Sequence, residues 1–88
     1  MTYLDMNEVQ MFLDNLQPME SFAVIYTKKD GSQRTLVGTL DPNTQKRMDN
    51  VPVMCEEGWR SFNRHNVLWI GYPDQVELLM ELMKKEVA

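Results

Sequence analysis

The chain has 88 residues, of which 43% are hydrophobic and 25% are charged, and its formal net charge at neutral pH is -4. This length and composition predict one soluble domain over residues 1–88 and exclude a disordered chain; no apolar run approaches the ~20 residues of a membrane span. The single cysteine, Cys55, excludes an internal disulfide, so we expect a protein of the reducing cytoplasm with no membrane partner.

The first predicted element is a helix over residues 5–17. Asp5 and Glu8 have the spacing of a capping box, and Pro18 ends the segment. Apolar residues recur at the helical spacing and form one face, which consists of Val9, Phe12, Leu13 and Leu16. The first twenty residues carry four acids and no base, so this helix is acidic.

The first two predicted strands form a hairpin. Residues 22–27 are rich in β-branched and aromatic side chains, and residues 33–40 form the return strand. Asp30 and Gly31 between them are a strong hairpin signal, because glycine accepts positive φ. Gly38 lies within the second strand and predicts a bulge or a sharp bend, which small barrels need at their corners.

Three further strands follow a polar connection over residues 41–50. The run VPVMC predicts the first of them, and a Glu-Glu-Gly turn at residues 56–58 leads to a second strand that begins at Trp59. A turn at residues 63–66 then precedes the run VLWIG, which predicts a continuous apolar strand.

The last predicted element is an amphipathic helix over residues 74–87. Asp74 and Glu77 repeat the capping-box spacing. Seven apolar residues nearly encircle the helix, and they are Val76, Leu78, Leu79, Met80, Leu82, Met83 and Val87. Met80 and Met83 either fill the core or, where the stripe is wider than the body can cover, form an adaptable face for another protein.

The order of helix, five short strands and helix predicts an α+β fold. We expect a small SH3/Sm-like antiparallel β-barrel over residues 21–72, flanked by an N-terminal and a C-terminal helix. The alternative is an antiparallel sheet with both helices on one of its faces. The long connection after the second strand favours the barrel.

The run EEGWRSFNRHN, residues 56–66, contains most of the candidates for chemistry. His65 has Ser61 and Cys55 as available nucleophiles, but neither has the sharp glycine-flanked turn or the third orienting acid of a catalytic relay. One histidine and one cysteine ten residues apart fit no metal-ligand spacing. We therefore predict that the protein is not an enzyme and uses no metal or cofactor.

The same run has features of a binding surface. Strand alternation places Trp59 on one face and both Arg60 and Phe62 on the other, and we expect Arg60 and Arg64 to face outward around a core built by the aromatics. With the basic residues of the first hairpin these arginines predict a basic strip suited to single-stranded nucleic acid; the hairpin contributes Lys28, Lys29 and Arg34. The acidic helices oppose this, since they repel a polyanion over about 10 Å at moderate salt.

Three stretches together resemble a small phage-encoded family described as WYL-like, whose members have an Sm-like SH3 β-barrel. They are the lysine-rich hairpin Lys28–Gly31, the strand Arg34–Leu40 that ends in Thr-Leu, and the Trp-Arg-Ser-Phe run Trp59–Phe62, with Val67 closing the motif. The resemblance covers residues 22–68. It implies a barrel, a phage source, a location in the host cell cytoplasm and no catalytic residue.

We therefore expect a non-enzymatic phage accessory or regulatory protein that binds another molecule. The first hypothesis is a protein-interaction module that acts on a host or phage protein, or that self-associates through the C-terminal helix with Met80 and Met83. The alternative is binding of single-stranded nucleic acid or a nucleotide by the barrel. That alternative uses the basic strip and an exposed aromatic, Trp59.

Overall fold

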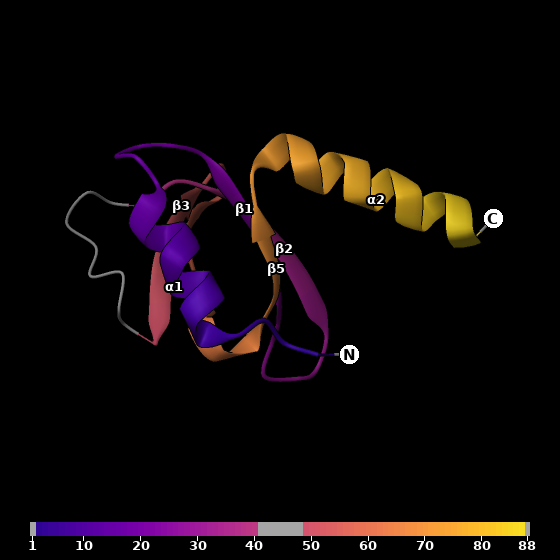
Figure 1. Cartoon of the computed structure of the whole chain (residues 1–88), viewed down its shortest axis with the longest axis horizontal. Helices are drawn as coiled ribbons and strands as arrows, with labels where there is room; N and C mark the ends of the chain where they lie inside the picture. Colours follow the sequence, from indigo (N-terminus) through magenta and orange to yellow (C-terminus); the bar gives the residue numbers. More distant parts are fainter. Residues whose placement is uncertain (1, 41–48, 88) are drawn as a thin grey trace.

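The computed structural model of the chain describes residues 2–40 and 49–87, and within them it contains two α-helices and five antiparallel strands (Figure 1). The polar connection predicted at residues 41–50 lies mostly outside this description. In chain order the elements are α1 Met6–Asn15, β1 Phe22–Thr27, β2 Gln33–Gly38, β3 Asn50–Cys55, β4 Gly58–Asn63, the short 3-10 helix η1 Arg64–Asn66, β5 Val67–Gly71 and α2 Pro73–Val87.

The strands form two antiparallel sheets. One has the order β2-β1-β5, and the other pairs β3 with β4. In the described part of the chain the two sheets meet at one backbone bridge, where Thr39 and Met54 exchange hydrogen bonds of 3.0 and 2.9 Å. The α+β class is confirmed. The sheets are not closed into a barrel, because no described residues pair β4 with β5, so the predicted barrel is not confirmed.

Gly38 lies beside the point where the two sheets come closest. A Cβ atom at this position would collide with the backbone carbonyl of Met54. The bulge predicted at Gly38 is absent, since Gly38 pairs with Phe22 in a regular register. The described irregularity lies instead between Ile25 and Tyr26, where β1 pairs with β5. The glycine is therefore needed for close approach of the second sheet.

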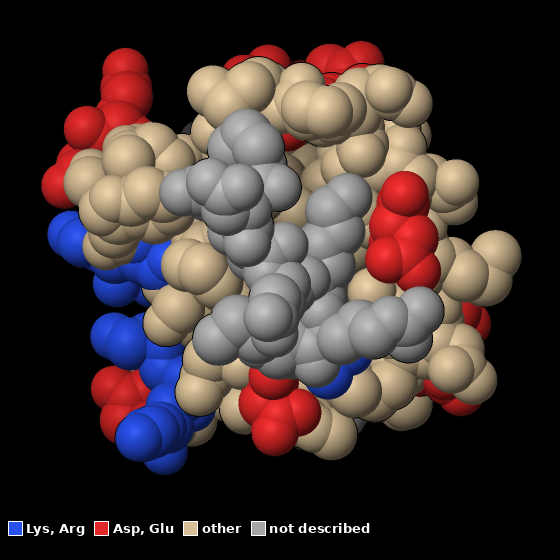
Figure 2. Space-filling view, turned by 90° about the vertical axis from the view of Figure 1, so that its left-hand side faces the viewer, with Lys and Arg blue, Asp and Glu red and all other residues tan. Residues whose placement is uncertain are grey.

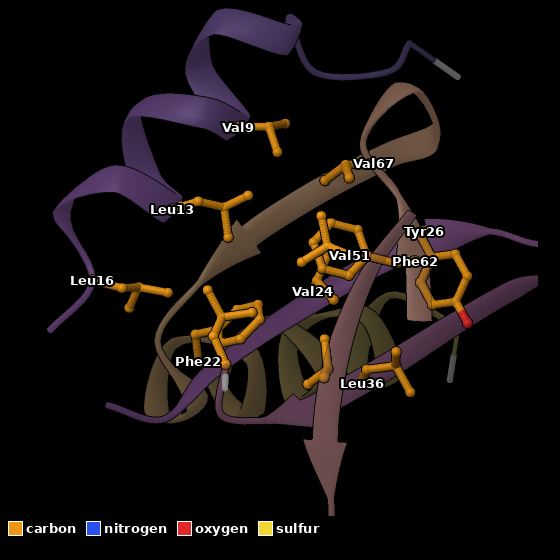
Figure 3. Close-up of a cluster of buried hydrophobic side chains, with 12 residues drawn as sticks. Val9, Leu13, Leu16, Phe22, Val24, Tyr26, Leu36, Val51, Phe62 and Val67 are labelled. Atoms are coloured by element: carbon orange, nitrogen blue, oxygen red, sulfur yellow. The ribbon is translucent and has the colours of Figure 1, made fainter. Parts of the chain in front are cut away.

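Helix α1 contributes one wall of the hydrophobic core. Its N-cap is Asp5, as predicted, and the carboxylate accepts a 2.7 Å hydrogen bond from the backbone N–H of Asn7. Figure 3 shows the apolar face of this helix, formed by Val9, Leu13 and Leu16, directed at a cluster of side chains from both sheets. The core thus lies between α1 and the two sheets, and it joins elements that are far apart in the sequence.

Phe62 is the aromatic residue that β4 contributes to the core. Its side chain is 1% exposed, and its ring centroid lies 6.4 Å from that of Phe22 and 6.3 Å from that of Tyr26. Trp59 is 49% exposed, and Trp69 on β5 is partly buried with its ring over Gly71. The expectation that these aromatics build the interior is therefore correct for Phe62 and wrong for Trp59. Three positions separate the two residues on the strand, so their side chains lie on opposite faces, and that of Trp59 faces away from the core.

Helix α2 extends away from the rest of the molecule (Figure 1). It begins at Pro73, and the Gln75 side chain accepts a 3.0 Å hydrogen bond from the backbone N–H of Tyr72. The cap is thus built two residues earlier than the predicted pairing of Asp74 with Glu77. The principal extents of the chain are 43 × 24 × 23 Å, which reflect this projecting helix.

Candidate functional site

A cleft opens where β2 and β3 diverge from their bridge at Thr39 and Met54. It has a volume of about 460 Å³ and is lined by Arg34–Val37 on β2 and by Cys55–Glu57 at the turn between β3 and β4. We call this the β2 cleft. The two-residue loop after Cys55 reverses the chain there, so β3 ends before it can cover the remaining edge of β2.

One arginine predicted from the sequence, Arg34, lines the β2 cleft, and a second, Arg60, acts on the pKa of Cys55 beside it. The Arg34 guanidinium is 3.8 Å from the Glu57 carboxylate across the opening. Arg60 is exposed, and its guanidinium donates a 2.9 Å hydrogen bond to the backbone carbonyl of Trp59. The cleft therefore carries charges of both signs. Arg34 faces the Glu57 carboxylate, and Arg60 bonds a backbone carbonyl.

The pKa of Cys55 depends on the charges around the β2 cleft, which this residue lines. Burial raises the pKa of the Cys55 thiol, and the Glu57 carboxylate adds to the rise. The guanidiniums of Arg60 and Arg34 act in the opposite direction, so both lie within electrostatic reach of the thiol. The thiol favours its protonated form, which is the opposite of what an activated nucleophile needs.

The other predicted residues of the basic strip are not all brought together. Lys28 and Lys29 are exposed in the loop of the β1–β2 hairpin, where Lys28 N–H donates to the carbonyl of Ser32. Figure 2 shows Lys and Arg side chains gathered along one side of the face it presents, with acidic side chains beside them. The face that Figure 2 presents thus carries charges of both signs.

Arg64 does not lie on the surface. Its side chain is buried, and the guanidinium donates a 2.6 Å hydrogen bond to Oε1 of Gln10 in α1. Its Nη2 atom also lies 3.6 Å from a carboxylate oxygen of Asp49. The expectation that Arg64 faces outward is therefore wrong, because helix α1 packs over η1 and supplies the acceptor.

The His65 ring lies beside the carboxylate of Asp49. Its Nε2 atom is 3.3 Å from Asp49 Oδ1, and both side chains are more than half exposed. The backbone N–H of His65 donates to the side-chain oxygen of Asn63, which caps η1. In the part of the chain that the structure describes, no three His, Cys, Asp or Glu side chains are placed to hold a metal ion.

Helix α2 presents a second candidate surface. Val76 in its first turn is 3% exposed and packs on the body, whereas Leu78 and Leu82 are 63% and 58% exposed. These two leucines stand four residues apart and so share one side of the helix. The side chains of Met80 and Met83, predicted to belong to this surface, lie outside the described residues. The observed surface is apolar on one side and acidic at Glu77 and Glu81.

Comparison of the chain with protein-family models, curated proteins and solved structures finds no match. The resemblance to the WYL-like family therefore stays a prediction. Among the described residues, no helix is both long and apolar enough to cross a membrane.

Proposed function

We propose that the protein is a non-enzymatic binding protein, a phage accessory protein that acts on a host or phage protein in the host cell cytoplasm. The observation that carries the proposal is the exposure of Leu78 and Leu82 on a helix that leaves the body. Most of the stability of a helix in a protein comes from packing of its apolar face against another element. A partner that covers the leucines would stabilise the projecting turns of α2.

The acidic residues of α2 indicate which surface such a partner presents. Asp74, Glu77 and Glu81 are all exposed, so a groove with an apolar floor and a basic rim complements this helix. This is the helix-in-groove mode of recognition, in which apolar residues spaced at three and four positions enter the groove. Electrostatic complementarity would raise the association rate and select the partner.

The experiment is a pull-down from host lysate with the full chain, followed by mass spectrometry and by titration of the captured protein. A double variant, Leu78→Ser with Leu82→Ser, should lose at least tenfold in affinity while its unfolding curve is unchanged. Glu8→Gln, at an exposed residue of α1 outside this surface, is the control and should retain full affinity. Equal capture by the double variant, or a strictly monomeric chain that captures nothing, would rule out this role of α2.

A second candidate function is the binding of single-stranded nucleic acid. It is supported by Trp59, which is half exposed beside the exposed Arg60, since bases stack on aromatic faces while a guanidinium pairs with phosphate. Fluorescence anisotropy with a labelled oligonucleotide at two salt concentrations tests it. Affinity should fall steeply with salt and on Arg60→Ala; no binding at low salt would exclude this function.

The predicted barrel is part of the same proposal. Read across the Thr39–Met54 bridge, the strands follow the order β5-β1-β2-β3-β4, in which β4 and β5 are the two edges. We propose that these edges approach each other in solution as they do in an SH3/Sm-like barrel. Backbone contacts between Ser61 and Leu68 in a nuclear Overhauser spectrum would support closure, and their absence would favour two separate sheets.

A further inference from the structure

The edge of β2 that faces the cleft has backbone groups with no strand partner among the residues that the structure describes. In an antiparallel pair, the hydrogen-bonding groups of alternate residues point toward the partner strand. The Lys28 N–H donates to the Ser32 carbonyl at 2.8 Å, and this sets the pattern for the β1–β2 ladder. Arg34 and Leu36 therefore turn their backbone groups toward β1, and Thr35 and Val37 turn theirs away.

The bridge at Thr39 supports this assignment. Thr39 is the next residue in the alternating series after Thr35 and Val37, and its N–H and carbonyl both bond to Met54 of β3. Beyond this bridge the chain turns back at Glu56 and Glu57, so no described strand continues along β2. The bridge thus marks the start of a strand position that the described residues leave empty.

The β2 cleft has the size of a ligand site at that position. Its volume of about 460 Å³ lies within the range of about 300–1,000 Å³ that is usual for ligand pockets. Both Thr35 and Val37 line it. An extended peptide is the ligand whose donors and acceptors repeat at the spacing of a strand edge, and addition of such a strand is a common mode of peptide recognition.

The side chains of β2 indicate the sequence of the peptide. Leu36 and Arg34 share one face of the strand, because they are two residues apart. A peptide antiparallel to β2 passes Leu36 first and Arg34 two residues later, and residues directly opposite each other on two strands are in contact. The peptide should therefore carry an apolar residue followed, two positions later, by an acidic one.

Arg34 is able to receive that acidic residue. Its distance of 3.8 Å to the Glu57 carboxylate exceeds the 2.7–2.9 Å that is typical of a charge-assisted hydrogen bond. Arg60 adds a second positive charge near the cleft, since its guanidinium lowers the pKa of Cys55, which lines the cleft. A carboxylate from a partner can thus pair with Arg34 in better geometry than Glu57 has.

From these observations we propose that the β2 cleft binds an extended segment of a partner protein, which adds to β2 as an antiparallel strand and carries the pattern apolar, any residue, acidic. This site lies on the opposite sheet edge from β5 and does not involve α2. It goes beyond the proposed role of the helix, since it gives the protein a second contact with a different kind of recognition.

The probe for the test is a displayed library of random heptapeptides, selected on the full chain and followed by titration of the enriched synthetic peptide. The enriched peptides should share the predicted pattern. Methylation of one peptide nitrogen at a time should divide the residues of the peptide into two alternating sets that differ in their loss of affinity. One set, which faces Thr35 and Val37, should lose at least tenfold in affinity, and the other set should change less than twofold.

Variants of the protein test the same contacts from the other side. Val37→Pro removes a donor from the free edge and leaves the β1 ladder intact, so it should lose at least tenfold in peptide affinity; Val37→Thr is the control that keeps the donor. Replacing the acidic peptide residue by its amide should weaken binding to the natural chain and leave binding to Arg34→Gln unchanged. The pair Leu78→Ser with Leu82→Ser should bind the peptide normally.

Three outcomes would overturn the proposal. The first is a selection that enriches no peptide. The second is an enriched peptide that binds equally well with every nitrogen methylated in turn, since a strand added to β2 requires one of the two sets. If peptide binding is instead lost in the α2 double variant, the peptide occupies the helix and the β2 cleft is not the site.

Discussion

The guanidinium of Arg64 donates a 2.6 Å hydrogen bond to Oε1 of Gln10, and this contact joins two residues that are 54 positions apart. Gln10 in turn donates from its amide nitrogen to Asp14 at 2.9 Å. The backbone N–H of Arg64 also donates to the carbonyl of Asp49 at 2.9 Å. A buried polar network therefore fixes α1 on the turn that precedes β5.

Removal of the acceptor in this network should destabilise the fold. Gln10→Leu leaves the charged guanidinium without the buried oxygen that it bonds, and we expect a loss of about 1–3 kcal/mol in the free energy of unfolding. Urea denaturation followed by tryptophan fluorescence measures it. Gln17→Leu, at an exposed glutamine, is the control and should change stability by less than about 0.5 kcal/mol.

Gly38 and Gly31 should respond very differently to alanine. At Gly38 a Cβ atom meets the backbone of Met54, which cannot move without breaking the bridge to Thr39, so we expect Gly38→Ala to cost more than about 3 kcal/mol. Gly31 has φ of 88° and open space around it, so Gly31→Ala should cost about 1 kcal/mol through backbone strain alone. Thermal melts of the two variants test this ranking, and equal melting temperatures would contradict the observed closeness of the sheets.

Alanine substitutions of the two large aromatics of β4 should differ as strongly in the stability that they cost. Phe62→Ala removes a ring that is 1% exposed and in contact with Phe22, so a loss of about 3–5 kcal/mol is expected. Trp59→Ala removes a ring that is 49% exposed and should cost less than about 1 kcal/mol. Chemical denaturation of both variants measures the difference. A larger loss for Trp59 would mean that β4 is rotated in its register.

The thiol of Cys55 should titrate above the ordinary range. Because burial and Glu57 raise its pKa, alkylation by iodoacetamide should reach half of its maximal rate at higher pH than in a denatured control. The native chain holds this proton more tightly than the unfolded chain. The associated stability is thus present below the ordinary thiol pKa and is lost as the pH rises through the raised value.

Variants at the β2 cleft should move this midpoint in opposite directions. Glu57→Gln removes a negative neighbour and should lower the pKa of Cys55, whereas Arg60→Gln removes a positive one and should raise it. Glu8→Gln on helix α1 is the control and should leave the midpoint unchanged. If neither variant moves the midpoint, the charges of Glu57 and Arg60 do not act on the thiol.

Asp30 should titrate below the ordinary range of an aspartate. The Ser32 hydroxyl donates to its carboxylate at 2.6 Å and the Ser32 N–H at 2.9 Å, and both bonds lower the pKa of Asp30. The stability that follows is present above the ordinary aspartate pKa and is lost as the pH falls through the lowered value. Carboxyl-carbon NMR titration should show the pKa of Asp30 rising in Ser32→Ala. Ser21→Ala, at the opposite end of β1 from this turn, should leave the pKa of Asp30 unchanged.

Much of the fold can be predicted from local signals in the sequence. The strand at residues 22–27 is found with the predicted bounds because alternation and β-branched residues are properties of the segment itself. The hairpin at Asp30 and Gly31 is found because positive φ is a local requirement of the turn. Likewise, Asp5 caps α1 because its acceptor needs only the next few backbone amides.

The features that could not be predicted depend on contacts distant in sequence. Arg64 is buried because Gln10 provides its acceptor, and no property of residues 63–66 contains that information. Alternation separates Trp59 from Phe62 on β4, but the face that becomes the interior depends on where α1 and the other sheet pack. The β2 cleft follows from the position at which β3 leaves β2, and this depends on the close approach of Gly38 to Met54.

The projection of α2 has a consequence for how the molecule moves through solvent. The radius of gyration is 12.8 Å, against about 12 Å for a spherical domain of this length. A body with one long axis experiences more frictional drag than a sphere of equal mass, so a single chain should elute early from a sizing column. Mass from scattered light, and not elution volume, is therefore the measure that separates one chain from two.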